Sequence, residues 1–173
     1  MKRKTALLYV LVAILLVGLC FVEKSRRARS KITIVPGVRM GVFILGMSKD
    51  DVLQKMGEPR GIHYGGKAYT LDNLPRRYYM SYSDVSFSID NGSVTGITVN
   101  GPPYTFANGL GIGDSVDKIK QAFGDNFQLD EREGQNALIY PEKGLRFDLN
   151  QEDRTVNEIS VVPAEDKKME NAK

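Results

Sequence analysis

The sequence predicts an α+β protein in which two tandem repeats, each a helix followed by an antiparallel meander of strands, stand behind an N-terminal membrane helix. Three observations lead to this prediction. A helix-like segment occurs twice, each copy precedes strand-like stretches of alternating polarity, and an uncharged apolar run opens the chain. The predicted domains are a membrane anchor and basic linker at 1–31, repeats at 32–100 and 101–164, and a disordered tail at 165–173.

The apolar run "TALLYVLVAILLVGLCFV" occupies 5–22 and follows three basic residues. At about 1.5 Å per residue it nearly spans a bilayer core of about 30 Å. No small-x-small cleavage site follows it, which favours a retained signal-anchor over a cleaved signal peptide. Cys20, the only cysteine, follows Leu19 and not the small residue typical of lipid attachment, so it is interpreted as a small hydrophobe.

The predicted location is therefore the plasma (inner) membrane of a bacterial cell, with a single span and an extracytoplasmic C-terminal domain. If the leader is cleaved, the protein is secreted or periplasmic. Residues 1–31 carry eight Lys and Arg against one Glu, whereas 32–173 carry sixteen against twenty acidic residues. A nucleic-acid-binding domain concentrates positive charge on its folded part, so no nucleic-acid partner is expected.

Each repeat is predicted to begin with a helix of about three turns, within 45–59 and 112–126. Ser48 and Ser115 are placed to accept a backbone N–H at the start of each helix. A glycine ends each helix, where a left-handed backbone costs glycine least. Helices this short are marginal alone and need a packing surface.

That surface is predicted to follow each helix. The stretch "VSFSIDNGSVTGITV" at 85–99 alternates apolar and polar residues around an Asn-Gly pair, which is typical of a β-hairpin. A second hairpin with a longer turn is predicted at 145–161. Additional strands are predicted at 76–82 and 136–140. Joining the two meanders edge to edge would hide two sheet edges that otherwise invite pairing.

The segment "GMSKDDVLQKMGEP" resembles a motif of the SmpA/OmlA (BamE) family of bacterial envelope proteins. The tandem arrangement is similar to the β-lactamase inhibitory protein type of fold. The matching residues are Gly46, Met47, Ser48, Val52, Gly57 and Pro59. The second copy departs from the motif, because Asp114 replaces the Met and no Pro closely follows Gly124. The resemblance implies an envelope-located, non-enzymatic binding module, but neither outer-membrane assembly nor inhibition of an enzyme.

The sequence offers little catalytic chemistry. His63 is the only histidine, and a zinc site would lack the usual His and Cys ligands. The stretch "GLGIGDS" at 109–115 lacks the spacing of a phosphate-binding loop and indicates a turn into a capped helix. No catalytic residue, cofactor or metal is therefore predicted. Two alternatives stay open: an enzyme that acts on an envelope polymer through paired carboxylates, and an accessory subunit whose anchor contacts a membrane complex.

The candidate partner-binding surface lies between the first helix and its hairpin, where the two repeats differ most. Tyrosine and arginine often anchor protein interfaces, because they combine a large rigid area with a polar tip. Some of these tyrosines could instead face inward from the predicted strand at 76–82. The predicted partner is an envelope or membrane protein. The candidate residues are Arg60, Tyr64, Tyr69, Arg76, Arg77 and Tyr78.

Overall fold

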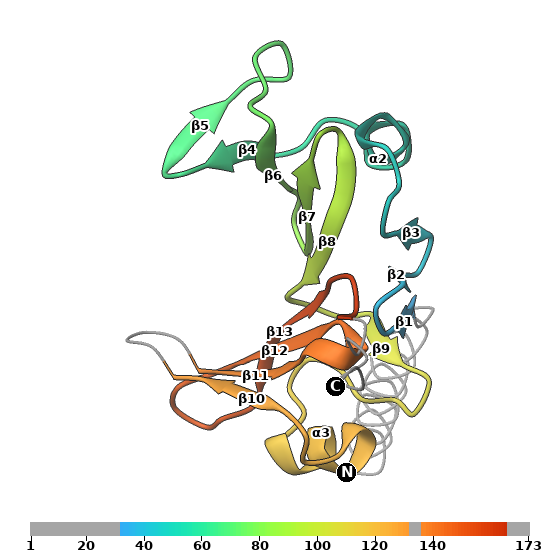
Figure 1. Cartoon of the computed structure of the whole chain (residues 1–173), viewed down its shortest axis with the longest axis vertical. Helices are drawn as coiled ribbons and strands as arrows, with labels where there is room; N and C mark the ends of the chain where they lie inside the picture. Colours follow the sequence, from blue (N-terminus) through green and yellow to red (C-terminus); the bar gives the residue numbers. More distant parts are fainter. Residues whose placement is uncertain (1–31, 132–135, 166–173) are drawn as a thin grey trace, which may run out of the picture. The chain divides into compact units, whose positions relative to one another are not determined.

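The computed structural model describes residues 32–131 and 136–165, which form two β-sheets and two short α-helices (Figure 1). All neighbours in the larger sheet are antiparallel. Its nine strands, in spatial order, are β10 (Gln128–Asp130), β11 (Ala137–Tyr140), β12 (Leu145–Leu149), β13 (Val156–Val161), β8 (Ser93–Val99), β7 (Val85–Asp90), β6 (Arg77–Ser81), β4 (Gly61–Tyr64) and β5 (Lys67–Tyr69).

The smaller sheet brings together segments that are far apart in the sequence. Its order is β3 (Phe43–Ile44), β2 (Arg39–Met40), β1 (Ile32–Val35) and β9 (Tyr104–Phe106). β1 pairs in parallel with β9, so that Ile32 lies opposite Tyr104 and Ile34 opposite Phe106. Parallel strands need a long connection. The connection between β1 and β9 contains α2 and the strands β4 to β8 of the larger sheet.

The predicted fold class was wrong. The described chain is mostly β-structure with two eight-residue helices, and it is not a tandem pair of helix-plus-meander repeats. The strands assigned to separate repeats form one sheet, because β8 pairs with β13 through Val99 opposite Ile159 and Ile97 opposite Val161. The prediction also lacked the four-stranded sheet. Its strands are two to four residues long, too short for alternation to predict their partners.

The helix positions were predicted correctly. α2 spans Lys49–Met56 and α3 spans Val116–Phe123. Ser48 Oγ accepts the Asp51 N–H at 3.0 Å, which confirms the predicted N-cap. Ser115 occupies the equivalent position before α3, but its side chain makes no capping hydrogen bond, so that part of the prediction was wrong.

Both helices are attached to the larger sheet by matching backbone hydrogen bonds at their N-terminal ends. Gly46 N–H donates to Val94 O, and Gly113 N–H donates to Val156 O, each at 2.7 Å. A tyrosine hydroxyl holds the other end of each helix. Tyr82 Oη donates to Gly57 O at 3.0 Å, next to the end of α2. Tyr140 Oη donates to Gly124 O at 2.8 Å, next to the end of α3.

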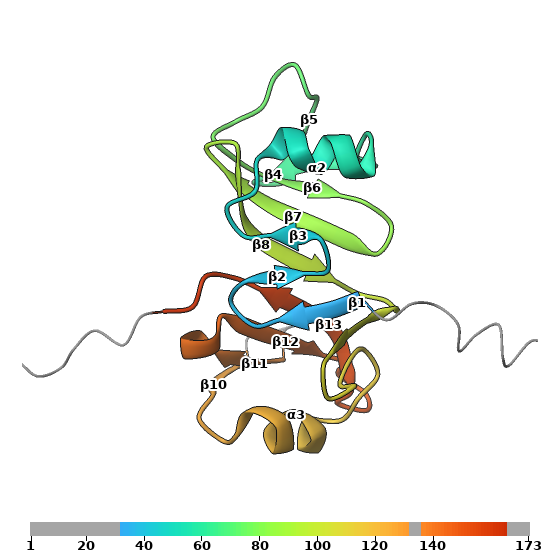
Figure 2. The same ribbon diagram turned by 90° about the vertical axis from the view of Figure 1, so that its right-hand side faces the viewer.

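The core lies between the larger sheet and the elements on one of its sides. Figure 2 shows α2, the four-stranded sheet and α3 following one another along that side. Phe43 of the smaller sheet contacts Phe87 of β7 with ring centroids 4.9 Å apart, and Phe106 contacts Phe147 of β12 at 5.8 Å. Val52 and Ile119, one from each helix, are fully buried in the same core. The opposite face of the sheet carries mainly polar side chains.

Neither helix in the described part of the chain is long or apolar enough to cross a membrane. The anchor predicted at 5–22 and the tail predicted at 165–173 fall outside the described residues, apart from Glu165.

Candidate functional site

Side chains along β6 point alternately to the two faces of the sheet. Two of its larger polar side chains therefore lie on the face that the helices do not cover. Arg77 and Tyr79 are exposed, whereas Tyr78 and Met80 point into the core. Tyr79 lies opposite His63 of β4 in the strand register, and the two rings stack with centroids 5.5 Å apart. Strand pairing therefore builds an exposed aromatic pair on this face.

A hollow of about 390 Å³ lies beside this pair. Tyr64 and Tyr79 leave 40% and 43% of their surfaces exposed at this site. The hydroxyl-bearing Ser88 and Thr95 contribute polar groups from β7 and β8. The residues that line the hollow are Tyr64, Arg77, Tyr78, Tyr79, Ser88, Ile89, Asp90 and Thr95.

Two arginines share one carboxylate at the rim of the hollow. Arg76 Nε donates to one oxygen of Asp90 at 3.0 Å, and Arg77 Nε donates to the other at 2.8 Å. These hydrogen bonds, from Arg77 first and then Arg76, lower the pKa of Asp90. The hydrogen bond and charge of Asp90, followed by the electrostatic effect of Tyr64, raise the pKa of Arg77. Asp90 and Arg77 therefore stay ionised at neutral pH.

We refer to His63, Tyr64, Arg76, Arg77 and Tyr79 as the tyrosine–arginine surface. Three of its members, Tyr64, Arg76 and Arg77, were candidate residues in the sequence.

The other three candidates do not belong to this surface, although the buried Tyr78 is among the residues that line the hollow. Tyr78 is 3% exposed and belongs to the core. Tyr69 on β5 is half-buried and packs against the core. Arg60 is exposed just before β4, where its N–H donates to Ser81 O at 2.8 Å.

Sequence reasoning missed Tyr79 and Asp90 as members of the site. The signal for Tyr79 was present, because it shares its strand parity with Arg77 and Ser81, whereas Tyr78 shares its parity with Met80. Asp90 gave no such signal. Its position next to Arg77 follows from the register of β6 against β7.

The burial of Tyr78 leads to a testable prediction. Its hydroxyl is buried and makes no hydrogen bond to any described residue, and burial raises its pKa. We expect Tyr78→Phe to leave the free energy of unfolding unchanged or to raise it by up to about 1 kcal/mol, since an unpaired buried polar group is removed. Tyr140→Phe, which removes a 2.8 Å hydrogen bond, should lower it by about 0.5–1.5 kcal/mol. Urea unfolding measures both, and a clear loss of stability in Tyr78→Phe would contradict the prediction.

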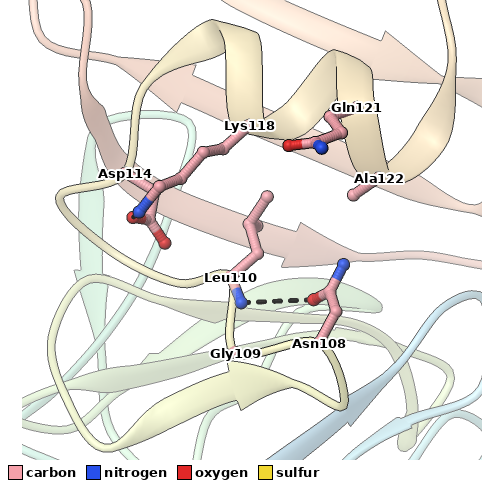
Figure 3. Close-up of a pocket in the computed structure, with 7 residues that line it drawn as sticks. All are labelled: Asn108, Gly109, Leu110, Asp114, Lys118, Gln121 and Ala122. Atoms are coloured by element: carbon pink, nitrogen blue, oxygen red, sulfur yellow. Dashed lines mark hydrogen bonds and ion pairs between the residues drawn. The ribbon is translucent and has the colours of Figure 1, made fainter.

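A second hollow of about 420 Å³ lies between α3 and the loop that precedes it (Figure 3). Asp114 forms an ion pair with Lys118 at its edge and accepts the Gly111 N–H at 2.9 Å. Burial acts against ionisation of this carboxylate, but these hydrogen bonds outweigh it and lower the pKa of Asp114. Asp114 therefore holds the loop in place, as expected for a turn into a helix and not for a phosphate-binding loop.

A group of charges occupies the other end of the uncovered sheet face. Arg146 of β12 forms ion pairs with Asp148 at 2.7 Å and with Asp130 of β10 at 2.8 Å. Glu158 of β13 lies directly opposite Asp148 in the register. Partial burial first, and then the charge of Asp148, raise the pKa of Glu158.

The raised pKa of Glu158 predicts a pH-dependent gain in stability for Glu158→Gln. The folded state binds this proton more tightly than the unfolded state, so ionisation of Glu158 destabilises the fold as the pH rises above the ordinary pKa of 4.5. At pH 7 we expect the free energy of unfolding to rise by a few tenths to about 1 kcal/mol, since solvent screens this half-exposed group. At pH 4 the gain should disappear.

Urea unfolding at both pH values tests this prediction. Glu152→Gln, which alters an exposed carboxylate in the β12–β13 turn, serves as the control and should change stability at neither pH. If Glu158→Gln changed the free energy of unfolding equally at pH 4 and pH 7, the prediction would be wrong, because the negative charge of Glu158 would then not be the cause of the effect.

Within residues 32–131 and 136–165, no group of three or more His, Cys, Asp or Glu side chains is arranged to hold a metal ion. His63 is exposed and stacks on the ring of Tyr79.

No family model matches the chain, and no curated protein matches it either. The solved structures similar to it include the following two. One is an extracellular protein containing an SCP domain from Bacillus anthracis, with 12% identity and a TM-score of 0.48 over 69% of this chain. The other is a cysteine-rich secretory protein from Staphylococcus aureus, with 11% identity and a TM-score of 0.46 over 76% of this chain. The alignments cover 44% and 48% of those chains, so this chain spans less than half of each.

The resemblance to the SmpA/OmlA (BamE) family and to the β-lactamase inhibitory protein fold was therefore wrong. No family model matches the chain, and its described strands form one nine-stranded and one four-stranded sheet and not two helix-plus-meander repeats. The physical reason lies in what the motif encodes. Gly46 and Gly57 have left-handed backbones on either side of α2, and Ser48 is its N-cap. These residues specify a short capped helix, which unrelated folds also use.

Proposed function

We propose that this chain is a non-enzymatic protein-binding module that acts outside the cytoplasm, and that it contacts its partner through the tyrosine–arginine surface. One observation carries the proposal: exposed Tyr64, Tyr79 and Arg77 line one hollow on the uncovered sheet face, and Arg76 is held next to it by the Asp90 carboxylate that it shares with Arg77. Exposed aromatic rings and arginines in a concave setting are the residues that most often dominate binding energy at interfaces.

The extracytoplasmic location rests on the sequence. A short basic head followed by an uncharged apolar run has the usual shape of an export signal. We therefore propose a secreted or periplasmic protein that binds an envelope or exported protein. The fold suits this role, because a sheet whose other face is fully packed offers a rigid platform that loses little entropy on binding.

Chemical cross-linking of the full chain in the exported fraction of the source cells tests the proposal. We expect the unaltered chain to capture a reproducible protein, identified by mass spectrometry. The double variant Arg77→Ala/Tyr79→Ala should reduce that capture roughly tenfold or more, because hot-spot residues often contribute over 1.4 kcal/mol each. Circular dichroism establishes that the variant is folded, which is expected since both side chains are exposed.

The matched control is Arg154→Ala/Leu129→Ala, which removes two exposed side chains from the other half of the chain. It should leave capture unchanged. The proposal fails if no protein is captured by any of the three chains. It also fails if the control variant and the Arg77/Tyr79 variant lose capture equally.

A further inference from the structure

The charges at the tyrosine–arginine surface are unequal. Arg76 and Arg77 contribute two positive charges, and Asp90 is the one carboxylate with which both form ion pairs. Their side chains are 68% and 61% exposed, whereas that of Asp90 is 22% exposed. The surface therefore presents one excess positive charge to solvent, on groups that can still contact a partner.

Asp90 also orients the two arginines. Each donates its Nε–H to a different oxygen of the same carboxylate, so the two terminal nitrogens of each guanidinium are left out of these ion pairs. A guanidinium has five N–H donors in a fixed plane, and its terminal pair matches the two oxygens of a carboxylate. Because Asp90 already restrains both side chains, a second anion would bind them with a reduced loss of side-chain entropy.

Aromatic rings lie directly beside these donors. Tyr64 and Arg77 line the same hollow, and Tyr64, after Asp90, contributes to the raised pKa of Arg77. Tyr79 also lines the hollow, and its ring stacks on that of His63. An occupant therefore meets a cationic rim and a flat, mainly apolar wall at the same time.

We propose that the tyrosine–arginine surface recognises an acidic segment of the partner protein. Carboxylates of that segment bind the terminal nitrogens of Arg76 and Arg77, and a neighbouring apolar or aromatic side chain lies against Tyr64 and Tyr79. This inference rests on the proposed function and specifies the chemistry of the partner. It follows from charge complementarity at the rim and from the aromatic character of the wall.

A polyanion such as an anionic lipid surface or a phosphate polymer fits this surface less well. Such ligands are bound by many Lys and Arg, and their affinity grows with the number of charges neutralised. Here the excess is a single positive charge, and residues 32–173 as a whole are acidic. The exposed tyrosines would also have no role in binding a purely ionic polymer.

A yeast-displayed library of random twelve-residue peptides tests the inference with the full chain as bait. We expect enriched peptides to contain Asp or Glu next to an aromatic or large aliphatic residue. The affinity of a representative synthetic peptide, measured by fluorescence anisotropy, should fall roughly tenfold or more in Arg76→Gln/Arg77→Gln. Arg76→Lys/Arg77→Lys keeps the charge but loses the planar pair of donors, so it should also weaken binding.

Arg39→Gln/Arg154→Gln is the matched control. It removes the same number of exposed arginines at other places and should bind the peptide normally. Binding that falls equally in this control would overturn the inference, because net charge and not the Asp90-held pair would then decide affinity.

The remaining outcomes separate this inference from the proposed function. Enrichment of neutral or basic peptides whose binding is lost in Tyr79→Ala would overturn the acidic partner and leave the binding module intact. Binding of phosphatidylglycerol vesicles or polyphosphate that is lost in Arg76→Gln/Arg77→Gln, without enrichment of acidic peptides, would overturn both, since the surface would then be a polyanion site. If no enriched peptide depends on any residue of the surface, the inference fails, while the cross-linking experiment still decides the proposed function.

Discussion

Replacing Phe147 with alanine is expected to lower the free energy of unfolding by about 3–5 kcal/mol, the usual cost of emptying an aromatic core position. Phe147 is fully buried on β12. Its ring lies 5.6 Å from that of Phe123 on α3, 5.8 Å from that of Phe106 on β9 and 6.1 Å from that of Tyr140 on β11. The ring therefore joins a helix and both sheets, and no single neighbour can move to fill the space it leaves.

Urea unfolding of the Phe147→Ala variant measures this loss. Phe147→Leu is the control, because it keeps most of the side-chain volume and should cost much less. A loss below about 1 kcal/mol in the alanine variant would show that the core collapses around the cavity and that Phe147 does not link the two sheets. Equal losses in both variants would point to aromatic contacts and not to volume as the main contribution.

Short-range features of this fold could be predicted from the sequence. Both helices occur where capping residues and apolar spacing placed them, and the hairpin of β7 and β8 turns at Asn91 and Gly92 as expected. Each of these features is decided by residues within a few positions of one another, and propensity and turn chemistry act over that distance.

Long-range pairing could not be predicted in the same way. The parallel contact of β1 with β9 joins residues about seventy positions apart, and neither strand carries a pattern that identifies the other. β9 has three residues and β3 has two. Each predicted repeat begins with its helix, whereas β1 to β3 and β9 precede the helices and cover part of the core with a sheet of their own.

The residue types in the segment between α2 and β7 selected the candidate residues, but they did not indicate which side chains face solvent. Counting tyrosines and arginines selected three residues that the structure brings near one another, because Tyr64 and Arg77 line one hollow and Arg76 shares the carboxylate of Asp90 with Arg77. Tyr78 was chosen and Tyr79 was not, although a strand directs neighbouring side chains to opposite faces. Only the register of β6 against β4 and β7 determines which of the two is exposed at the hollow.

Replacing Gly144 with alanine should lower the free energy of unfolding by about 2–5 kcal/mol. Two costs add at this position. Its φ of +60° lies in the left-handed region, where a side chain costs about 1–2 kcal/mol. A Cβ would also lie 2.1 Å from Val162 O and 2.9 Å from Gly37 Cα. Both contacts are with backbone, so relief requires movement of the chain beyond β13 or of the β1–β2 turn, at the usual overpacking cost of about 1–3 kcal/mol.

Gly65→Ala separates the two costs, because Gly65 has nearly the same φ of +57° but nothing within 4 Å of an added Cβ. The free energy of unfolding of this variant should fall by only about 1–2 kcal/mol, the cost of a left-handed backbone at a residue with a side chain. Gly144→Ala must therefore be the less stable of the two variants in thermal and urea unfolding. Equal losses would mean that the segment after β13 yields freely, and the close approach of Gly37, Gly144 and Val162 would then not be a rigid junction between the two sheets.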